Sequence, residues 1–481
     1  MPKITTNFIY NVALTLSTYL INLILFPYVS RVLGVDMVGK VGFVNETVNY
    51  FSLFAVMGVA TVGIREIAAC GDDREKRSRV FSSLMAIVGV LTFGVTLVYL
   101  GSLFVVNRFQ ADRNLFVIGT GTLLFTSLLI EWFYQGMENF RYITIRSILV
   151  KLAYAAAVFL TVRRPEDYLI YFALTVGAVI VNAVINIGYS RRYATLSLHN
   201  VDLKAYLKPV FSLGMYKVMV SMFTTFNVIY LGFVSTETEC GYYYTSKKLF
   251  YLVLGIFSAF AAVMLPRMSS MLADRKSQEF SQKIDQSFDI VFAFAIPLIV
   301  LFVLMAPQII ILMSGSGYEG AVTPMRILSP VLLVTTMAQI WTMQILIPMR
   351  KDRVILVTSA IGAFLGILVN ILLVKRLGAV GSALVLLISE TAGNLYSFFY
   401  VIRNGYLVFP TRKFLTFLLG SIPYVLCCLA GMAIPGSVWA ELLVACGLMA
   451  FYFLIFNGFL YKRTLINRYL ISALSLLKRW L

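Results

Sequence analysis

Long apolar runs recur along almost the whole chain, and they limit its fold more than any other feature. Each run is about as long as the ~20 residues that an α-helix needs to cross the hydrocarbon core of a bilayer. Hydrophobic residues make up 60% of the 481 residues and charged residues only 13%, whereas a globular domain has roughly 25% charged residues. We therefore expect an all-α integral membrane protein. The fourteen runs that we expect to span the membrane are 6–30, 42–64, 80–106, 114–137, 142–162, 168–189, 210–234, 242–265, 286–313, 322–348, 354–374, 382–402, 414–433 and 440–460.

Lysine and arginine residues are distributed unevenly between the two sides of these helices. If the N-terminus is cytoplasmic, 27 of them lie on the cytoplasmic side when Arg146, near the cytoplasmic end of the run 142–162, is counted there; 8 lie on the opposite side and five deeper inside helices. Cytoplasmic connections of membrane proteins carry such an excess. The distribution predicts that both termini are cytoplasmic. It also explains the net charge of +18 without nucleic acid as a partner.

The connections between the runs are short. The longest of them, 65–79, 191–209 and 266–285, have at most about 20 residues each, which leaves no room for a soluble catalytic domain. We therefore do not expect a membrane glycosyltransferase or polymerase. The single histidine, His199, and five cysteines without a CxxC pair predict no metal or haem cofactor and no disulfide framework.

An internal repeat is suggested by an offset of 202 residues, which aligns 8–65 with 210–267 without a gap. Gly39 then meets Gly241, and both segments read as a helix, a short outer loop with glycine, and a second helix. Because transporters are often built from repeats, we predict two parallel six-helix lobes around a central cavity, plus two extra helices. The expected parts are a lobe of residues 1–190, a cytoplasmic linker of 191–209, a second lobe of 210–402, helices 13 and 14 within 403–460, and an amphipathic cytoplasmic tail of 461–481.

Polar side chains gather on single faces of the first two predicted helices. Asparagine and threonine recur every three or four residues there, which places them on one side of a helix. Since polar groups in lipid are costly, such a face is expected to line a cavity or to contact another helix. For the asparagines we favour the cavity. The residues expected to line it are Asn11 and Asn22 in the first helix and Asn45 and Asn49 in the second.

Four basic residues within the predicted helices are candidates for binding an anionic substrate: Lys217, Lys247, Lys248 and Arg326. Each charge costs about 2.5–3.5 kcal/mol at a helix centre on insertion scales, so it needs a reason to be there. The alternative is that these long side chains reach toward the membrane surface as anchors.

Two acidic residues are candidates for coupling transport to H⁺ or Na⁺. Glu390 is expected near the middle of its helix, where an acid is either paired with a cation or protonated. Glu46 is shallower, and its alternative role is an ion pair with Lys40 or with a lysine of the helix at 242–265. Glu131, near the cytoplasmic end of its helix, is expected to be a structural anchor.

Three stretches resemble the oligosaccharide flippases of bacterial polysaccharide biosynthesis, which belong to the multidrug/oligosaccharidyl-lipid/polysaccharide exporter superfamily. The first is LFPYVSRVLGVDMVGKVGF at 25–43, with its Arg-x-Leu-Gly followed by a second glycine. The second is GVATVGIREIAA at 58–69, and the most specific is EWFYQGMENFRYITIRSIL at 131–149.

This resemblance implies a substrate and an action. It implies that an undecaprenyl-pyrophosphate-linked oligosaccharide moves from the inner to the outer leaflet of a bacterial cytoplasmic membrane by alternating access. Membrane lipids and other polysaccharide-assembly proteins are the implied partners. Cations suit a pyrophosphate, while amides and the aromatic faces of Tyr242, Tyr243 and Tyr244 suit sugars. The alternatives are a drug/cation antiporter of the same superfamily, expected to have an acidic cavity, and a non-transporting assembly scaffold.

Overall fold

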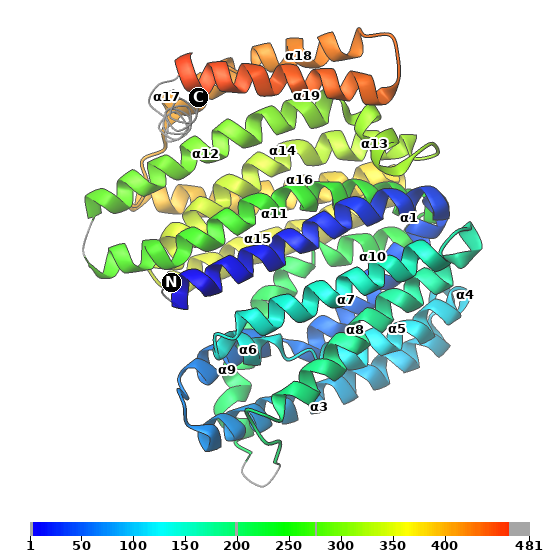
Figure 1. Cartoon of the computed structure of the whole chain (residues 1–481), viewed down its shortest axis with the longest axis vertical. Helices are drawn as coiled ribbons and strands as arrows, with labels where there is room; N and C mark the ends of the chain where they lie inside the picture. Colours follow the sequence, from blue (N-terminus) through cyan, green and yellow to red (C-terminus); the bar gives the residue numbers. More distant parts are fainter. Residues whose placement is uncertain (1–2, 198–200, 275–276, 461–481) are drawn as a thin grey trace, which may run out of the picture. The chain divides into compact units, whose positions relative to one another are not determined.

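A computed structural model describes residues 3–197, 201–274 and 277–460, and the secondary structure of these residues is helical (Figure 1). His199 and the amphipathic tail expected at 461–481 lie outside the described residues. The α-helices are α1 Lys3–Val56, α2 Val59–Ala68, α3 Arg74–Val105, α4 Asn107–Ala111, α5 Arg113–Thr126, α6 Glu131–Gly136, α7 Phe140–Thr161, α8 Tyr168–Ser190, α9 Leu203–Ser221, α10 Thr225–Val234, α11 Glu237–Ala273, α12 Ser277–Leu304, α13 Ala306–Ser314, α14 Val322–Trp341, α15 Asp352–Val369, α16 Lys375–Arg403, α17 Thr411–Leu419, α18 Ile422–Met432 and α19 Val438–Ile455.

The protein is an all-helical, multi-pass membrane protein. Within the described residues, 11 helical segments are long and apolar enough to cross a membrane, or 12 if the bent pair α9 and α10 forms one span. Two of these segments, Tyr10–Val56 and Asp352–Arg403, have 47 and 52 residues, far more than the ~20 that one span needs. Each is interrupted by a glycine with left-handed backbone, Gly34 at φ 74° and Gly378 at φ 54°. The fourteen separate spans expected from the sequence stay a prediction.

Several expected spans are broken where the sequence pattern shows one continuous run. Three of these are 42–64, divided between α1 and α2, 210–234, divided between α9 and α10, and 414–433, divided between α17 and α18. The run 114–137 is divided between α5 and α6, and Ile130 adopts the left-handed conformation just before α6 begins. The run 286–313 is divided between α12 and α13 at Met305. None of these breaks removes the apolar character that places the segment in the membrane.

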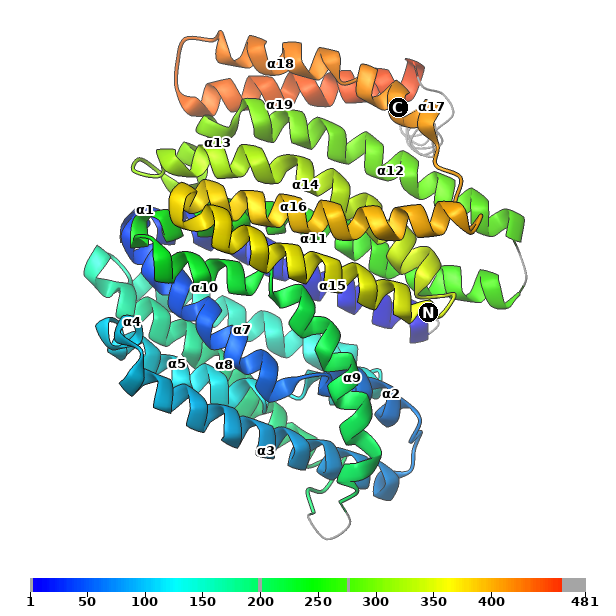
Figure 2. The same cartoon turned by 180° about the vertical axis from the view of Figure 1, so that it is seen from behind.

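By its internal contacts the chain divides into two compact units, Met1–Tyr244 and Thr245–Leu481, and the division falls within α11. This point differs from the lobe limits expected from the sequence, and the two-lobe organisation stays a prediction. In the second unit α14 packs against α12 and α16, α15 packs against α16, and α18 packs against α19. Figure 2 shows α15 and α16 side by side.

In the first unit, α1 packs against α3, α5, α7 and α10, while α8 packs against α5 and α7. A second group of contacts joins α2 to α6 and α9. Gly63 of α2 lies so close to Trp132 of α6 that a Cβ on Gly63 would be 2.2 Å from the indole ring. The second and third resemblance segments, 58–69 and 131–149, therefore pack directly against each other.

Positions related by the 202-residue offset also contact one another within the first unit. A Cβ on Gly39 would lie 1.9 Å from the carbonyl oxygen of Glu237, and a Cβ on Gly241 would lie 2.2 Å from that of Val35. The 202-residue offset relates position 35 to position 237 and position 39 to position 241. The contact of 39 with 237 is therefore the counterpart of the contact of 241 with 35. Reciprocal contacts of this kind are what a two-fold relation between similar segments produces, and they favour the repeat.

Candidate functional site

The asparagine face of α1 lies opposite its exposed apolar side. Asn11 and Asn22 lie about half a helical turn away from Leu16 and Leu20, which are 51% and 56% exposed. The face points away from the side that suits lipid, as expected for a cavity or a helix contact. Asn22 donates from Nδ2 to the carbonyl oxygen of Thr18 at 2.9 Å, so its amide nitrogen is satisfied by its own helix. Asn11 is exposed.

A lysine of α7 joins this face. Lys151 donates from Nζ to Oγ1 of Thr18 at 2.6 Å. Lys151 is the fifth basic residue counted inside the predicted helices, and its sequence context alone gives it no place in the candidate site. Its partner lies 133 residues away in the sequence, so no local pattern could have joined the two. Among the described residues, this ammonium group contacts a neutral hydroxyl, and no carboxylate lies within ion-pair distance of it.

Lys217 lies in the C-terminal third of α9 and is half-buried. Its Nζ forms neither a hydrogen bond nor an ion pair with any described residue. An ammonium group in an apolar helix without an anionic partner is costly, which fits a group that binds a ligand. Lys217 belongs to the first unit, whereas Lys247 and Lys248 belong to the second. That these three lysines form one cationic site stays a prediction.

The second arm of α1 carries the other predicted asparagines. Asn45 is hydrogen-bonded with Tyr244, whose ring packs against Gly42. Asn49 is exposed. Glu46 lies on the same arm and is half-buried. Lys40, one of the two partners proposed for Glu46, instead forms an ion pair with Asp112 at 3.1 Å.

The proposed aromatic surface for sugars needs a correction at Tyr243. This side chain is fully buried, and its hydroxyl accepts a hydrogen bond from Nδ2 of Asn227 at 2.9 Å. It is therefore a core residue of the first unit and does not present its ring to a ligand. Three adjacent residues point in three directions around a helix, so they cannot all face one cavity.

The predicted cations of the second unit differ in their surroundings. Nζ of Lys247 lies 5.9 Å from the ring centroid of Tyr251, a cation–π contact, and Lys248 follows it on α11. Arg326 is exposed and donates from Nε to the carbonyl oxygen of Val303 at 3.0 Å. This bond satisfies a backbone carbonyl near the end of α12, which fits the alternative role of an anchor, and a role of Arg326 in substrate binding stays a prediction.

Glu390 lies in α16 as expected, and one of its oxygens accepts a hydrogen bond from Nδ2 of Asn394 at 2.9 Å. No lysine or arginine among the described residues lies within ion-pair distance of it. An unpaired carboxylate inside a membrane helix is costly, so Glu390 is expected to be protonated for part of a transport cycle or to bind a cation.

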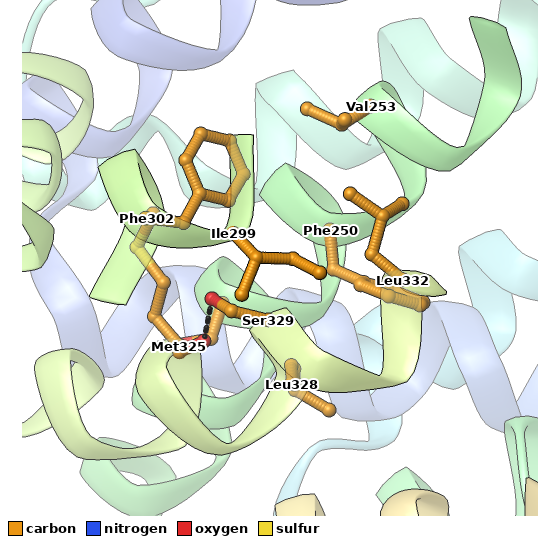
Figure 3. Close-up of a pocket in the computed structure, with 9 residues that line it drawn as sticks. Phe250, Val253, Ile299, Phe302, Met325, Leu328, Ser329 and Leu332 are labelled. Carbon is orange, nitrogen blue, oxygen red and sulfur yellow. Dashed lines mark hydrogen bonds between the residues drawn. The ribbon is translucent and has the colours of Figure 1, made fainter. Parts of the chain in front are cut away.

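A small cavity of the second unit lies between α11, α12 and α14 (Figure 3). Its volume is about 10 Å³, which is room for about one water molecule. The lining is apolar apart from Ser246 and Ser329, and Ser329 donates to the carbonyl oxygen of Met325. This cavity is therefore too small for a sugar or a drug, and it contains none of the predicted site residues.

A sequence model of the family described as "Polysaccharide biosynthesis protein" matches residues 4–272. The chain is 25% identical over 420 residues to a protein of Escherichia coli (strain K12) named "Putative O-antigen transporter", covering 84% of this chain and 97% of that relative. A protein of the same name from Shigella dysenteriae is 23% identical over 389 residues, covering 78% of this chain and 94% of that relative.

Two solved structures have a similar fold. The lipid II flippase MurJ in an inward closed conformation superposes with a TM-score of 0.76 at 15% identity, covering 93% of this chain and 98% of that one. A multidrug resistance MATE family transporter of the MOP superfamily, in an outward-facing conformation, gives 0.55 at 14% identity, covering 83% and 95%. The family model covers more than half of the sequence, and this chain is a member of the polysaccharide biosynthesis protein family.

Proposed function

We propose that the protein is a flippase that moves an undecaprenyl-pyrophosphate-linked oligosaccharide from the inner to the outer leaflet of a bacterial cytoplasmic membrane. The observation that carries this proposal is the similarity to proteins named O-antigen transporters, which extends over 97% and 94% of their lengths. The fold shared with the lipid II flippase supports a membrane transporter and argues against an enzyme.

The anionic end of such a substrate matches the basic side chains of the membrane helices. Lys217 has no partner among the described residues, and Lys151 has only the hydroxyl of Thr18. A pyrophosphate leaving water needs charged donors, and a lysine supplies three N–H groups without a fixed geometry. We propose that these two lysines, with Lys247 and Lys248, bind the pyrophosphate during translocation.

Polar groups without charge suit the sugars. Asn11 and Asn49 are exposed, and amide groups both donate to and accept from sugar hydroxyls. In Asn22 the amide nitrogen is bonded to its own helix, and the side-chain carbonyl oxygen is available to a ligand. The side chain of Asn45 is already hydrogen-bonded with Tyr244. In this proposal Glu390 couples the cycle to H⁺ or Na⁺, and Glu46 is a secondary candidate.

Complementation tests the proposal in a bacterial strain that lacks its own flippase and is supplied with a matching lipid-linked oligosaccharide. We expect the wild-type protein to restore surface polysaccharide and to reduce the lipid-linked oligosaccharide retained in the cytoplasmic leaflet. Lys217→Gln should accumulate in the membrane normally but reduce this activity at least tenfold. The matched control is Lys208→Gln, which changes an exposed lysine of the same helix and should retain activity.

The results separate the alternatives. A scaffold that does not transport would tolerate Lys217→Gln as well as Lys208→Gln, and purified protein in vesicles would not move the substrate. A drug/cation antiporter would confer resistance to cationic drugs without restoring surface polysaccharide. Either pattern would contradict the flippase proposal.

A further inference from the structure

A groove of about 540 Å³ lies on the first unit, where α7 begins and α8 ends. One end of the groove is polar, with Asn139, Arg141, Tyr142 and Arg146 among its lining residues. The other end is apolar and includes Leu149, which is 61% exposed. By the charge distribution of the sequence, this is the cytoplasmic side of the membrane. The groove therefore joins a basic, polar end to an apolar surface of the kind that contacts lipid.

Arg146 is the buried charge at the polar end, with only 6% of the residue exposed. Its Nη2 donates to Oε1 of Glu131 at 2.5 Å, the structural pairing expected for Glu131. Its Nε and Nη1 are buried and have no hydrogen-bond partner among the described residues. Leaving donors of a buried guanidinium unpaired is unfavourable, and more so than for a buried neutral group. Arg146 itself lines the groove, so these buried donors lie beside the space that a ligand would occupy.

The surroundings of Arg146 carry further positive potential. Arg141 is exposed at the rim of the groove, and Lys151 lies near enough for its charge to repel that of Arg146. Asn139 caps α7 by accepting a hydrogen bond from the backbone N–H of Tyr142. The groove thus also contains the positive end of a 22-residue helix. Glu131 opposes these charges through its ion pair with Arg146.

Tyrosine rings form the wall beside this charge. Tyr142 and Tyr189 are stacked with ring centroids 4.0 Å apart, and Cζ of Arg146 lies 5.9 Å from the Tyr142 ring. The hydroxyls of Tyr189 and Tyr193 are 3.0 Å apart, and this hydrogen bond raises the pKa of Tyr193, so its hydroxyl stays protonated. Tyrosine rings with hydroxyls at a polar edge are typical of the level of lipid headgroups.

We propose that this groove binds an anionic phospholipid of the cytoplasmic leaflet, with its phosphodiester beside Arg146 and Arg141 and an acyl chain along Leu149 and Ile185. Basic pockets between membrane helices on the cytoplasmic side suit anionic headgroups. The volume lies within the range of pockets that bind small ligands and has room for one phosphoglycerol headgroup. The inference is separate from the proposed flippase activity.

Lipid binding to the purified full-length protein tests the proposal by native mass spectrometry, with phosphatidylglycerol and phosphatidylcholine of the same chain length as probes. We expect the wild-type protein to prefer phosphatidylglycerol about tenfold. Since each basic residue near the surface contributes about a fivefold preference, Arg141→Gln should lower it about fivefold. The double variant Glu131→Gln with Arg146→Gln, which removes both charges of the pair, should abolish it.

The matched control is Arg79→Gln, an exposed arginine of α3 outside the groove, which should keep the preference. Thermal unfolding of each variant in detergent shows whether it remains folded. If the double variant does not fold, the lipid preference of Arg141→Gln, which changes only an exposed residue, still tests the proposal. Equal binding of the two lipids by the wild-type protein would overturn the proposal. So would a preference that the groove variants leave unchanged. If undecaprenyl phosphate binds the groove and phosphatidylglycerol does not, the phospholipid assignment is wrong.

Discussion

The reciprocal glycine contact between α1 and the first turns of α11 gives a sharp prediction. A methyl group on Gly39 would lie 1.9 Å from the carbonyl oxygen of Glu237, whereas ordinary contacts begin at 3.4 Å. Gly39→Ala therefore has to move α11 away by about 1.5 Å or strain both helices. Overpacking of this kind costs about 1–3 kcal/mol. If the contact forms in only one state of a transport cycle, that cost changes its population by about 5- to 150-fold.

Chemical cross-linking between positions 36 and 238 measures the contact, because Oγ1 of Thr238 donates to Oδ1 of Asp36 at 2.6 Å. Cysteines at both positions, in a background without the native cysteines, should be joined by a short bis-maleimide. We expect Gly39→Ala to reduce the cross-linked fraction severalfold. The counterpart Gly241→Ala should do the same, because its methyl group would lie 2.2 Å from the carbonyl oxygen of Val35.

Gly89→Ala is the matched control for this experiment. A Cβ on Gly89 of α3 has no atom within 4 Å, so alanine fits there and favours the helix by roughly 1 kcal/mol. The cross-linked fraction should therefore stay at the wild-type value. If all three alanine variants cross-link equally well, the glycine contact does not control this end of the helices and the reasoning is refuted.

Three further predictions concern topology, coupling and stability. A cysteine at Ser316 should react with an impermeant thiol reagent in intact cells and one at Ser277 only after lysis; the opposite pattern would reverse the orientation. Glu390→Gln keeps a hydrogen-bonding group beside Asn394 but cannot titrate, so ion-dependent transport should stall while the protein still folds. If transport by that variant depends on the ion as it does in the wild-type protein, Glu390 has only a structural role. Lys413 binds Asp285 and Asp289 at 2.6 and 2.8 Å, so Lys413→Gln should destabilise the second unit by about 3 kcal/mol in thermal unfolding, and an unchanged Tm would contradict this.

The sequence predicted an all-helical membrane protein correctly, because membrane insertion depends on local apolar character, whereas the number of spans stays a prediction. It also predicted the two sharp interruptions, since Gly34 and Gly378 lie in the short stretches between apolar runs. The break before α6 was not predictable in the same way. Ile130 adopts the left-handed conformation, which an isoleucine rarely does, so tertiary packing imposes it. No residue pattern in that run indicates the interruption.

The candidate site was less predictable, because its contacts join distant parts of the chain. The sequence identified Lys217 and Glu390 as charges within apolar helices, and the structure finds no ion pair for either among the described residues. It did not reveal that Lys151 contacts Thr18, or that Tyr243 is buried against Asn227. Helical spacing gives the face of a residue relative to its own helix, whereas the neighbour of that face depends on the fold.

The partners of the charged residues separate structural roles from functional ones. Lys413 of α17 forms ion pairs with two carboxylates of α12, Asp285 and the almost fully buried Asp289. These two ion pairs hold α17 against α12. Arg146 has one carboxylate and two unused donors, while Lys217 has no partner among the described residues. A charge that only stabilised the fold would be better replaced by an apolar residue than left in this state. The incomplete pairing of Lys217 and Arg146 among the described residues therefore supports our two proposals, a translocated headgroup at Lys217 and a lipid of the cytoplasmic leaflet at Arg146.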